Sequence, residues 1–178
     1  MAAESPATLL QAVAELATRT GEVARARWEP GIAAEAKGDG SPVTVADREA
    51  ERFAREWLAE RFPHDGIVGE EFGTSAPTPG AGGAARKWIL DPIDGTKSFV
   101  RGVPLWGTLV AVMEGPEVIA GAAAFPMTAE CVAAARGEGA WWNGARCGVS
   151  AVASLAAATV TSTGTALDRK STRLNSSH

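Results

Sequence analysis

The sequence of 178 residues has few of the residues on which several common kinds of site depend. Cys131 and Cys147 are the only cysteines, too few for a disulfide framework or a thiolate zinc site. Free thiols and a cytoplasmic setting are therefore the default expectation. The sequence holds two histidines, one of them the last residue, which argues against a Ser-His-Asp triad or a histidine-rich metal centre. Any metal ion would have to be bound by oxygen atoms.

Long apolar runs and basic clusters are also missing. No segment approaches the roughly 20 apolar residues that a membrane span needs, and the N-terminus lacks the basic leader and apolar stretch of a signal peptide. Seventeen Lys and Arg against 21 Asp and Glu give a formal net charge of −4, with no basic stretch before the C-terminal tail. We therefore expect neither nucleic-acid nor membrane binding. An anionic substrate stays possible, because a bound cation can reverse the local charge.

Two helices are predicted near the N-terminus. Apolar residues recur at helical spacing from about Pro6 to Trp28, with charged residues around the rest of the helix surface. A second helix is predicted from about Val45 to Arg61, where Thr44 can cap the first turn and Asp47 stands three residues later, close to a capping box. Between them, "EAKGDGSPVTVAD" indicates a glycine-broken loop or a hairpin.

The rest of the chain reads as short strands. "GIVGEEFG" predicts a buried strand ending at Glu70 and Glu71, and "WIL" in "WILDPIDGTKSF" predicts another that ends at Asp91. Further short apolar runs between about 105 and 136 are separated by glycine, proline or charge, and "WWNGAR" contains an Asn-Gly hairpin signal. These features predict a layered α+β fold, with two helices packed on a large antiparallel sheet.

Acidic residues gather at the predicted strand ends. Glu70 follows one strand, Asp91 follows another, and Asp94 lies in the turn after the second. Bringing these carboxylates together without a cation is unfavourable because of like-charge repulsion and desolvation. Mg²⁺ prefers carboxylate, carbonyl and water oxygens, and the proline in this turn could direct the Ile93 carbonyl at such an ion. The spacing therefore favours a magnesium site.

An anion-binding site is predicted beside these acids. Gly95 and Thr96 offer backbone N–H groups where a helix could start. Cations next to such groups suit a phosphate ester, because the metal activates a water and stabilises the leaving oxygen. Taken alone, "DPIDG" is most often a surface turn, "GEE" a solvated strand end and Asp47 a helix cap. Only the whole set, in order, favours the catalytic interpretation.

Four segments in this order resemble the inositol monophosphatase family: "KGDGSPVTVAD", "GIVGEE", "WILDPIDGTKSF" and "GEGAWWNG". The resemblance covers about residues 5–165. It implies an inositol monophosphatase/fructose-1,6-bisphosphatase-like fold, a homodimer when intact, and a Mg²⁺-dependent phosphomonoesterase acting on a small-molecule phosphate ester. For the metals, it implies that Glu70, Asp91 and the Ile93 carbonyl bind the first ion, while Asp91 and Asp94 bind the second.

The resemblance also implies roles around the reacting water. Glu70 would help to orient the attacking water, and Thr96, supported by Asp47, would position it. Asp94 and the N–H groups of Gly95 and Thr96 would bind the substrate phosphate. The Asp47 side chain could serve both as this support and as the helix cap.

Residues 97 and 98 bear on the branch of the family. The sequence has Lys97-Ser98 where inositol phosphatases more usually have Thr-Asn. This variant resembles the histidinol-phosphatase branch, which converts L-histidinol phosphate to L-histidinol and phosphate in histidine biosynthesis. Inositol-1-monophosphatase is the alternative. A non-catalytic binding module of the same fold is a further alternative, although it would not need the acidic set.

The resemblance predicts how the chain is divided. Residues 1–153 form the N-terminal α+β metal-binding subdomain, and 154–168 begin a C-terminal α/β subdomain. Family members continue through that subdomain to a Trp-Asp motif that completes the second metal site, which this sequence does not contain. Residues 169–178 resemble translated sequencing-adaptor read-through and are predicted not to be native. We therefore expect this chain to be poorly active, or a damaged fragment that does not fold stably.

Overall fold

We describe a computed structural model of the chain that covers residues 4–36, 38, 42–78 and 86–159. The chain divides into two compact units, residues 1–148 and 149–178. Among the described residues of the second unit, a single 3-10 turn spans Leu155–Ala157. The predicted tail, 169–178, and most of the predicted C-terminal start, 154–168, lie outside the described residues.

Both predicted N-terminal helices are confirmed. Helix α1 spans Pro6–Ala26, and the Ser5 hydroxyl caps it by accepting a hydrogen bond from the Thr8 N–H. Helix α2 spans Val45–Arg61 and begins with a complete capping box between Thr44 and Asp47. The segment between the helices forms a hairpin, with β1 at Ala34–Ala36 and β2 at Pro42–Thr44. Among the described helices, none has both the length and the apolar character that a bilayer crossing requires.

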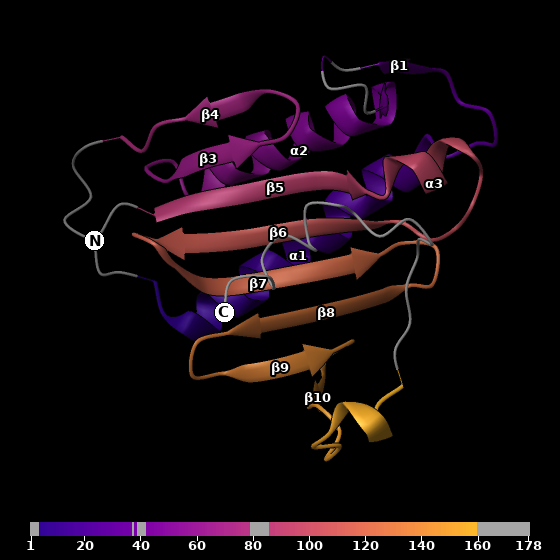
Figure 1. The fold of residues 1–178 in the computed structure, drawn as a ribbon. Helices are drawn as coiled ribbons and strands as arrows, with labels where there is room; N and C mark the ends of the chain where they lie inside the picture. The colour runs from indigo at the N-terminus through magenta and orange to yellow at the C-terminus, as the bar shows by residue number, and fades with distance from the viewer. Residues whose placement is uncertain (1–3, 37, 39–41, 79–85, 160–178) are drawn as a thin grey trace, which may run out of the picture. The chain divides into compact units, whose positions relative to one another are not determined.

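A large sheet forms the centre of the first unit (Figure 1). Its strand order is β10-β9-β8-β7-β6-β5-β3-β4. All neighbouring pairs are antiparallel except β3 and β5, which run parallel. The predicted helix-on-sheet α+β fold is confirmed, with this one parallel pair added. The strands are β3 (Gly66–Gly69), β4 (Gly73–Ser75), β5 (Arg86–Asp94), β6 (Gly107–Glu114), β7 (Glu117–Phe125), β8 (Glu130–Ala135), β9 (Gly139–Trp142) and β10 (Ala145–Cys147).

The two helices cover one face of this sheet. In Figure 1, α1 runs behind the middle strands, where it packs on β6, β7 and β8, while α2 packs on β5. Alternate residues of the strands point into this layer, so that Trp88, Leu90, Val110 and Val112 are buried. Burial of these apolar side chains is the main stabilising contribution to the layer.

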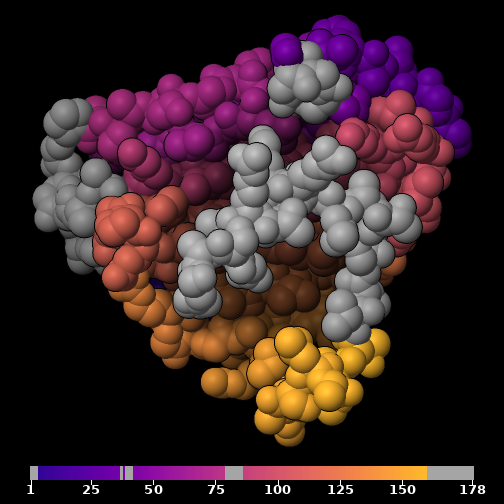
Figure 2. Space-filling model, in the orientation of Figure 1, coloured from indigo at the N-terminus to yellow at the C-terminus, as the bar shows by residue number. Residues whose placement is uncertain are grey.

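The other face of the sheet carries apolar side chains that are less covered. Figure 2 views the molecule from this side. Ile89 is 36% exposed and Val132 is 39% exposed. Trp142, the register partner of Val132, is 50% exposed. The face away from the helices therefore retains apolar surface over β5, β8 and β9.

The parallel pairing of β3 and β5 determines where the acids lie. Gly69 at the end of β3 is in register with Leu90 of β5, so the next residues, Glu70 and Asp91, lie side by side. Strand β5 then bulges: between its pairings at Asp91 and Asp94 it has one more residue than β6. Such bulges redirect side chains at the end of a ladder, and here the bulge contains the predicted metal-binding turn.

Candidate metal and phosphate site

Asp91 lies at the centre of the acidic cluster. Burial raises the pKa of this carboxyl, and Glu70 raises it further through its charge and a side-chain hydrogen bond. The charges of Asp94 and Asp47 add to the shift, so that the pKa of Asp91 rises from 3.8 to about 7. The structure therefore brings together the four acidic side chains that the sequence singled out, from α2, β5 and the turn after β3.

The cluster has a covered centre and open sides. Asp91 is partly buried, whereas Glu70 and Asp94 are exposed. A hydrogen bond between two carboxyl groups needs a proton between them, which agrees with the raised pKa of Asp91. A cation at this place would replace that proton and neutralise the same repulsion. The open sides leave room for a small anionic ligand.

One atom in the cluster lacks a hydrogen-bond partner. The Oδ1 atom of Asp91 is buried and accepts no hydrogen bond. A buried carboxylate oxygen in this state is unfavourable, and a bound hard cation would satisfy it. In the described part of the chain, no three Asp, Glu, His or Cys side chains are arranged to hold a metal ion. The predicted first site needs two carboxylates, Glu70 and Asp91, with the Ile93 carbonyl, so the donor set fits a hard cation while its ligation stays a prediction.

Two hydroxyl groups fix the turn after Asp91. Thr108 of β6 is buried, and its hydroxyl donates to the Pro92 carbonyl at 2.8 Å. The Thr96 hydroxyl donates to the Ile93 carbonyl at 2.9 Å. A carbonyl has two lone pairs, so Ile93 can still accept from a cation. The Ile93 side chain is buried, which anchors the turn in the core.

Gly95 joins this turn to a short helix. Its φ is +89°, in the left-handed region that favours glycine, and α3 follows at Thr96–Val100. A Cβ atom here would also lie 3.2 Å from the Leu105 carbonyl oxygen. The predicted binding of phosphate by Asp94 and by the N–H groups of Gly95 and Thr96 stays a prediction.

Asp47 caps α2. It is 1% exposed, and its Oδ2 atom accepts hydrogen bonds from the Thr44 N–H and hydroxyl, both at 2.7 Å. The capping alternative is therefore confirmed. The same carboxylate also lies close enough to Asp91 to raise its pKa, so the cap belongs to the acidic cluster as well. Its predicted support of Thr96 stays a prediction.

Sequence reasoning missed a buried carboxylate beside the cluster and its ion-pair partner. Glu51 of α2 is fully buried, and the Arg55 Nε donates to its Oε1 at 2.8 Å. The signal was present in the sequence: Glu51 falls one helical turn after Asp47, between Ala50 and Ala54 on the apolar face. A glutamate among apolar positions indicates a buried partner.

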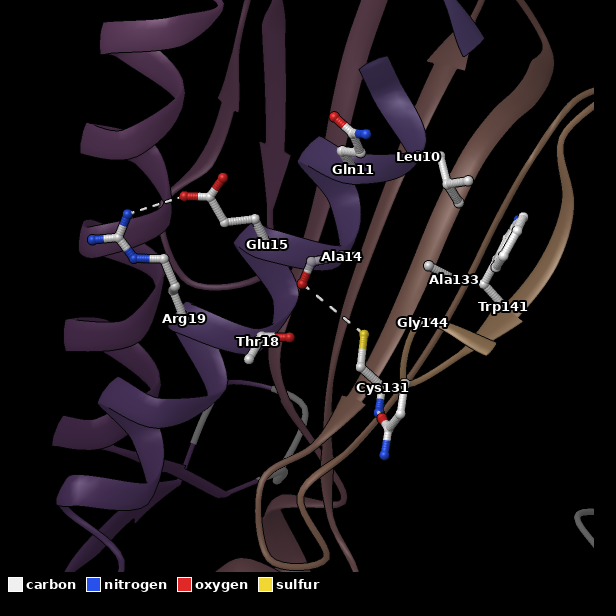
Figure 3. Close-up of a pocket in the computed structure, with 11 residues that line it drawn as sticks. Leu10, Gln11, Ala14, Glu15, Thr18, Arg19, Cys131, Ala133, Trp141 and Gly144 are labelled. Carbon is white, nitrogen blue, oxygen red and sulfur yellow. Dashed lines mark hydrogen bonds and ion pairs between the residues drawn. The ribbon is translucent and has the colours of Figure 1, made fainter. Parts of the chain in front are cut away.

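A separate cavity of about 560 Å³ lies between α1, β8 and β9. Figure 3 shows its lining, in which Ala14, Cys131 and Trp141 face the space together with polar groups of α1. The Cys131 thiol is 4.0 Å from the Ala14 carbonyl oxygen. None of the predicted site residues lines this cavity. It is therefore not the candidate catalytic site.

The fold of the chain is shared with solved structures. The extragenic suppressor protein suhB from Bartonella henselae superposes with a TM-score of 0.70 and 30% sequence identity, over 82% of this chain and 55% of that chain. The model of the inositol monophosphatase family matches residues 5–176. The chain belongs to the inositol monophosphatase family, which confirms the resemblance drawn from its motifs.

Two curated relatives bear on the branch of the family. Histidinol-phosphatase from Chlorobaculum parvum is 45% identical over 124 residues, which is 70% of this chain and 46% of the relative. Inositol-1-monophosphatase from Rhizobium meliloti is 38% identical over 124 residues, or 70% of this chain and 45% of the relative. The chain thus spans about half the length of these relatives.

Proposed function

We propose that the intact protein is a Mg²⁺-dependent phosphomonoesterase whose substrate is L-histidinol phosphate. The observation that carries the metal-dependent chemistry is Asp91, a partly buried carboxyl whose pKa is raised by three neighbouring acids and whose Oδ1 lacks a partner. The similarity to histidinol-phosphatase and the Lys97-Ser98 pair support the substrate.

The residues of the cluster have separate tasks in this proposal. Glu70, Asp91 and the Ile93 carbonyl would hold one Mg²⁺, and Asp91 with Asp94 a second. A bound metal supplies an activated water and stabilises the leaving oxygen. Glu70 would also help to orient that water by accepting one of its hydrogen bonds.

The turn around Gly95 would bind and orient the phosphate. The Thr96 hydroxyl is held by its bond to the Ile93 carbonyl, beside the place where the water would lie. Asp94 and the N–H groups of Gly95 and Thr96 would orient the phosphate group, because backbone donors stabilise the charge that its oxygens carry. The short helix α3 begins at Thr96, directly after Gly95.

A substrate panel tests the proposal. A version extended to the full length of the relatives would be assayed for phosphate release from L-histidinol phosphate and from inositol 1-phosphate, with and without Mg²⁺. We expect Mg²⁺-dependent release with a higher kcat/KM for L-histidinol phosphate. A preference for inositol 1-phosphate would favour the second candidate, inositol-1-monophosphatase, which the 38% identical relative supports. Absence of release from either ester, with no Mg²⁺ binding in calorimetry, would favour the non-catalytic module.

A further inference from the structure

The turn that carries Glu70 is held by hydrogen bonds from α2. Glu51, fully buried in that helix, accepts a hydrogen bond from the Glu71 N–H to its Oε2 at 2.7 Å. Its Oε1 accepts from the Phe72 N–H at 3.2 Å. These two N–H groups directly follow Glu70 along the chain, so one carboxylate fixes the backbone on the C-terminal side of the predicted metal ligand.

Arg55 extends this connection across the β3–β4 hairpin. Its Nε donates to Glu51 at 2.8 Å, while its terminal nitrogens reach the Gly73 carbonyl at 2.5 Å and the Ser75 hydroxyl at 3.0 Å. Hydrogen bonds to charged groups are stronger than neutral ones, and removing one partner from a buried pair leaves an uncompensated charge. The ion pair thus connects α2 to the Glu71 and Phe72 N–H groups. It also connects α2 to Gly73 and Ser75 of β4.

Contact on the N-terminal side of Glu70 is equally close. A Cβ atom on Gly69 would lie 1.9 Å from the Glu51 Oε1 atom and 2.7 Å from an Arg55 nitrogen. Only a glycine lets the carboxylate approach the strand this closely. Glu70 is therefore held between a backbone contact at Gly69 and a hydrogen bond at Glu71.

Strand pairing links this turn to Asp91. Gly69 is in register with Leu90, so any shift of this hairpin moves Glu70 relative to Asp91. The contact of Glu51 with this hairpin therefore bears on the place of Glu70 relative to Asp91.

We infer that Glu51 is a positioning residue for the metal site: by binding the N–H groups of Glu71 and Phe72, it sets the place of Glu70 beside Asp91. The inference rests on the proposed function and adds a residue that touches neither metal nor substrate. A glutamate that served only fold stability would leave metal affinity unchanged in the molecules that fold. The positioning role instead predicts a change in metal affinity.

Glu51→Gln tests this role, with Glu56→Gln as the matched control. Both replace a glutamate of α2 by its amide, but Glu56 is exposed. In the 178-residue chain, we expect amide hydrogen exchange at Glu71 and Phe72 to become about tenfold faster in Glu51→Gln, as loss of a charge-assisted bond implies. Exchange in β6 should change by less than about threefold. Equal exchange at Glu71 and Phe72 in both variants would overturn the inference.

The link to the metal is measured in the extended protein. For Glu51→Gln we expect the Mg²⁺ concentration at half-maximal rate to rise about tenfold, with kcat recovering at saturating Mg²⁺ and KM unchanged. A lower kcat at unchanged Mg²⁺ dependence, matched by a lower Tm, would show a structural role only and overturn the inference. Failure of the proposed function has a different signature, namely a wild-type protein without Mg²⁺-dependent turnover but with the exchange contrast intact.

Gly69→Ala is the second variant, in case Glu51→Gln does not fold. It keeps the ion pair of Glu51 and Arg55 but forces the carboxylate away from the strand. We expect the same selective acceleration of exchange at Glu71 and Phe72, and the same increase in the Mg²⁺ requirement. Wild-type exchange and Mg²⁺ dependence in Gly69→Ala would contradict the inference.

Discussion

Two turns bring the acids together, and they are held in different ways. The turn after Asp91 is fixed by its own residues and its neighbouring strand, through the bonds of Thr96 to Ile93 and of Thr108 to Pro92. The turn that carries Glu70 is fixed by a helix that precedes it in the chain, through the buried carboxylate of Glu51. The first turn is therefore held by hydroxyl groups of the turn and of the adjacent strand, and the second by a buried carboxylate of a helix.

The difference explains how each turn responds to change. The turn after Asp91 is formed by a glycine, a proline and two hydroxyl groups, each with a modest contribution to stability. The turn that carries Glu70 depends on one buried carboxylate, whose loss leaves the N–H groups that it binds without their partner. We expect substitutions in the first turn to have graded effects, and substitutions in the second to act through the metal.

The largest expected effect comes from Asp91→Asn, which removes the carboxylate that both turns face. In the extended protein we expect Mg²⁺ binding to be lost and kcat to fall by on the order of a thousandfold, because the activated water is lost. Calorimetry and phosphate release measure both. Retained Mg²⁺ affinity in Asp91→Asn would show that the metal does not lie between the two turns.

The pH dependence of stability is the next comparison. The pKa of Asp91 is raised in the folded chain, from 3.8 to about 7, so the folded state binds the proton more tightly than the unfolded state. Its stabilising contribution is full below 3.8 and is lost as the pH rises through about 7. We therefore expect the free energy of unfolding of the metal-free chain to decrease across this range.

Asp91→Asn is the control for this pH effect. Urea unfolding at several pH values should show a smaller decrease in the variant, because the titrating carboxyl is gone. Added Mg²⁺ should also reduce the decrease in the wild-type chain. Parallel pH curves for the two proteins would contradict the shift.

Gly95→Ala tests the turn after Asp91 through its backbone. The φ of +89° is costly for any residue with a Cβ atom, so we expect a loss of about 1–2 kcal/mol in the free energy of unfolding. Gly148→Ala is the control, since no atom lies within 4 Å of a Cβ there and the backbone does not need glycine. Equal stability of the two variants in urea would show that this turn tolerates side chains.

Thr108→Val gives the smallest expected effect. It keeps the shape of the side chain but removes the donor to the Pro92 carbonyl, which should lower stability by about 1 kcal/mol. Thr74→Val on exposed β4 serves as the control. If the two turns are held independently, exchange should increase at Ile93 and Asp94 but not at Glu71. Faster exchange at Glu71 as well would show that the two turns are coupled.

The sequence predicted the local parts of the structure well. Helix α2 begins and ends at the predicted residues, because its cap, Thr44, and its apolar face are formed by residues that are close together in the sequence. The strand into Asp91 was also predicted, from an apolar run followed by Pro92 and Gly95, but β5 continues through a bulge to Asp94 instead of ending at Asp91. The acids at its end were recognised because carboxylates there need a counter-charge.

The tertiary parts were not predictable in this way. The parallel pairing of β3 with β5 follows from how the chain returns to the sheet, which no local pattern specifies. The position of Glu51 on the apolar face of α2 indicates burial, but only the folded chain shows that its carboxylate lies against Gly69 and accepts from the Glu71 and Phe72 N–H groups. The close approach at Gly69 depends on how α2 packs against β3, which no sequence pattern predicts.

A carbon-13 NMR titration of the Asp91 side chain tests the central claim most directly. The claim is that acids from two separately held turns lie close enough to need a shared proton or a cation. We predict an apparent pKa of about 7 for Asp91 in the metal-free chain and a lower value with Mg²⁺ bound. An ordinary carboxyl pKa that does not respond to Mg²⁺ would contradict the account.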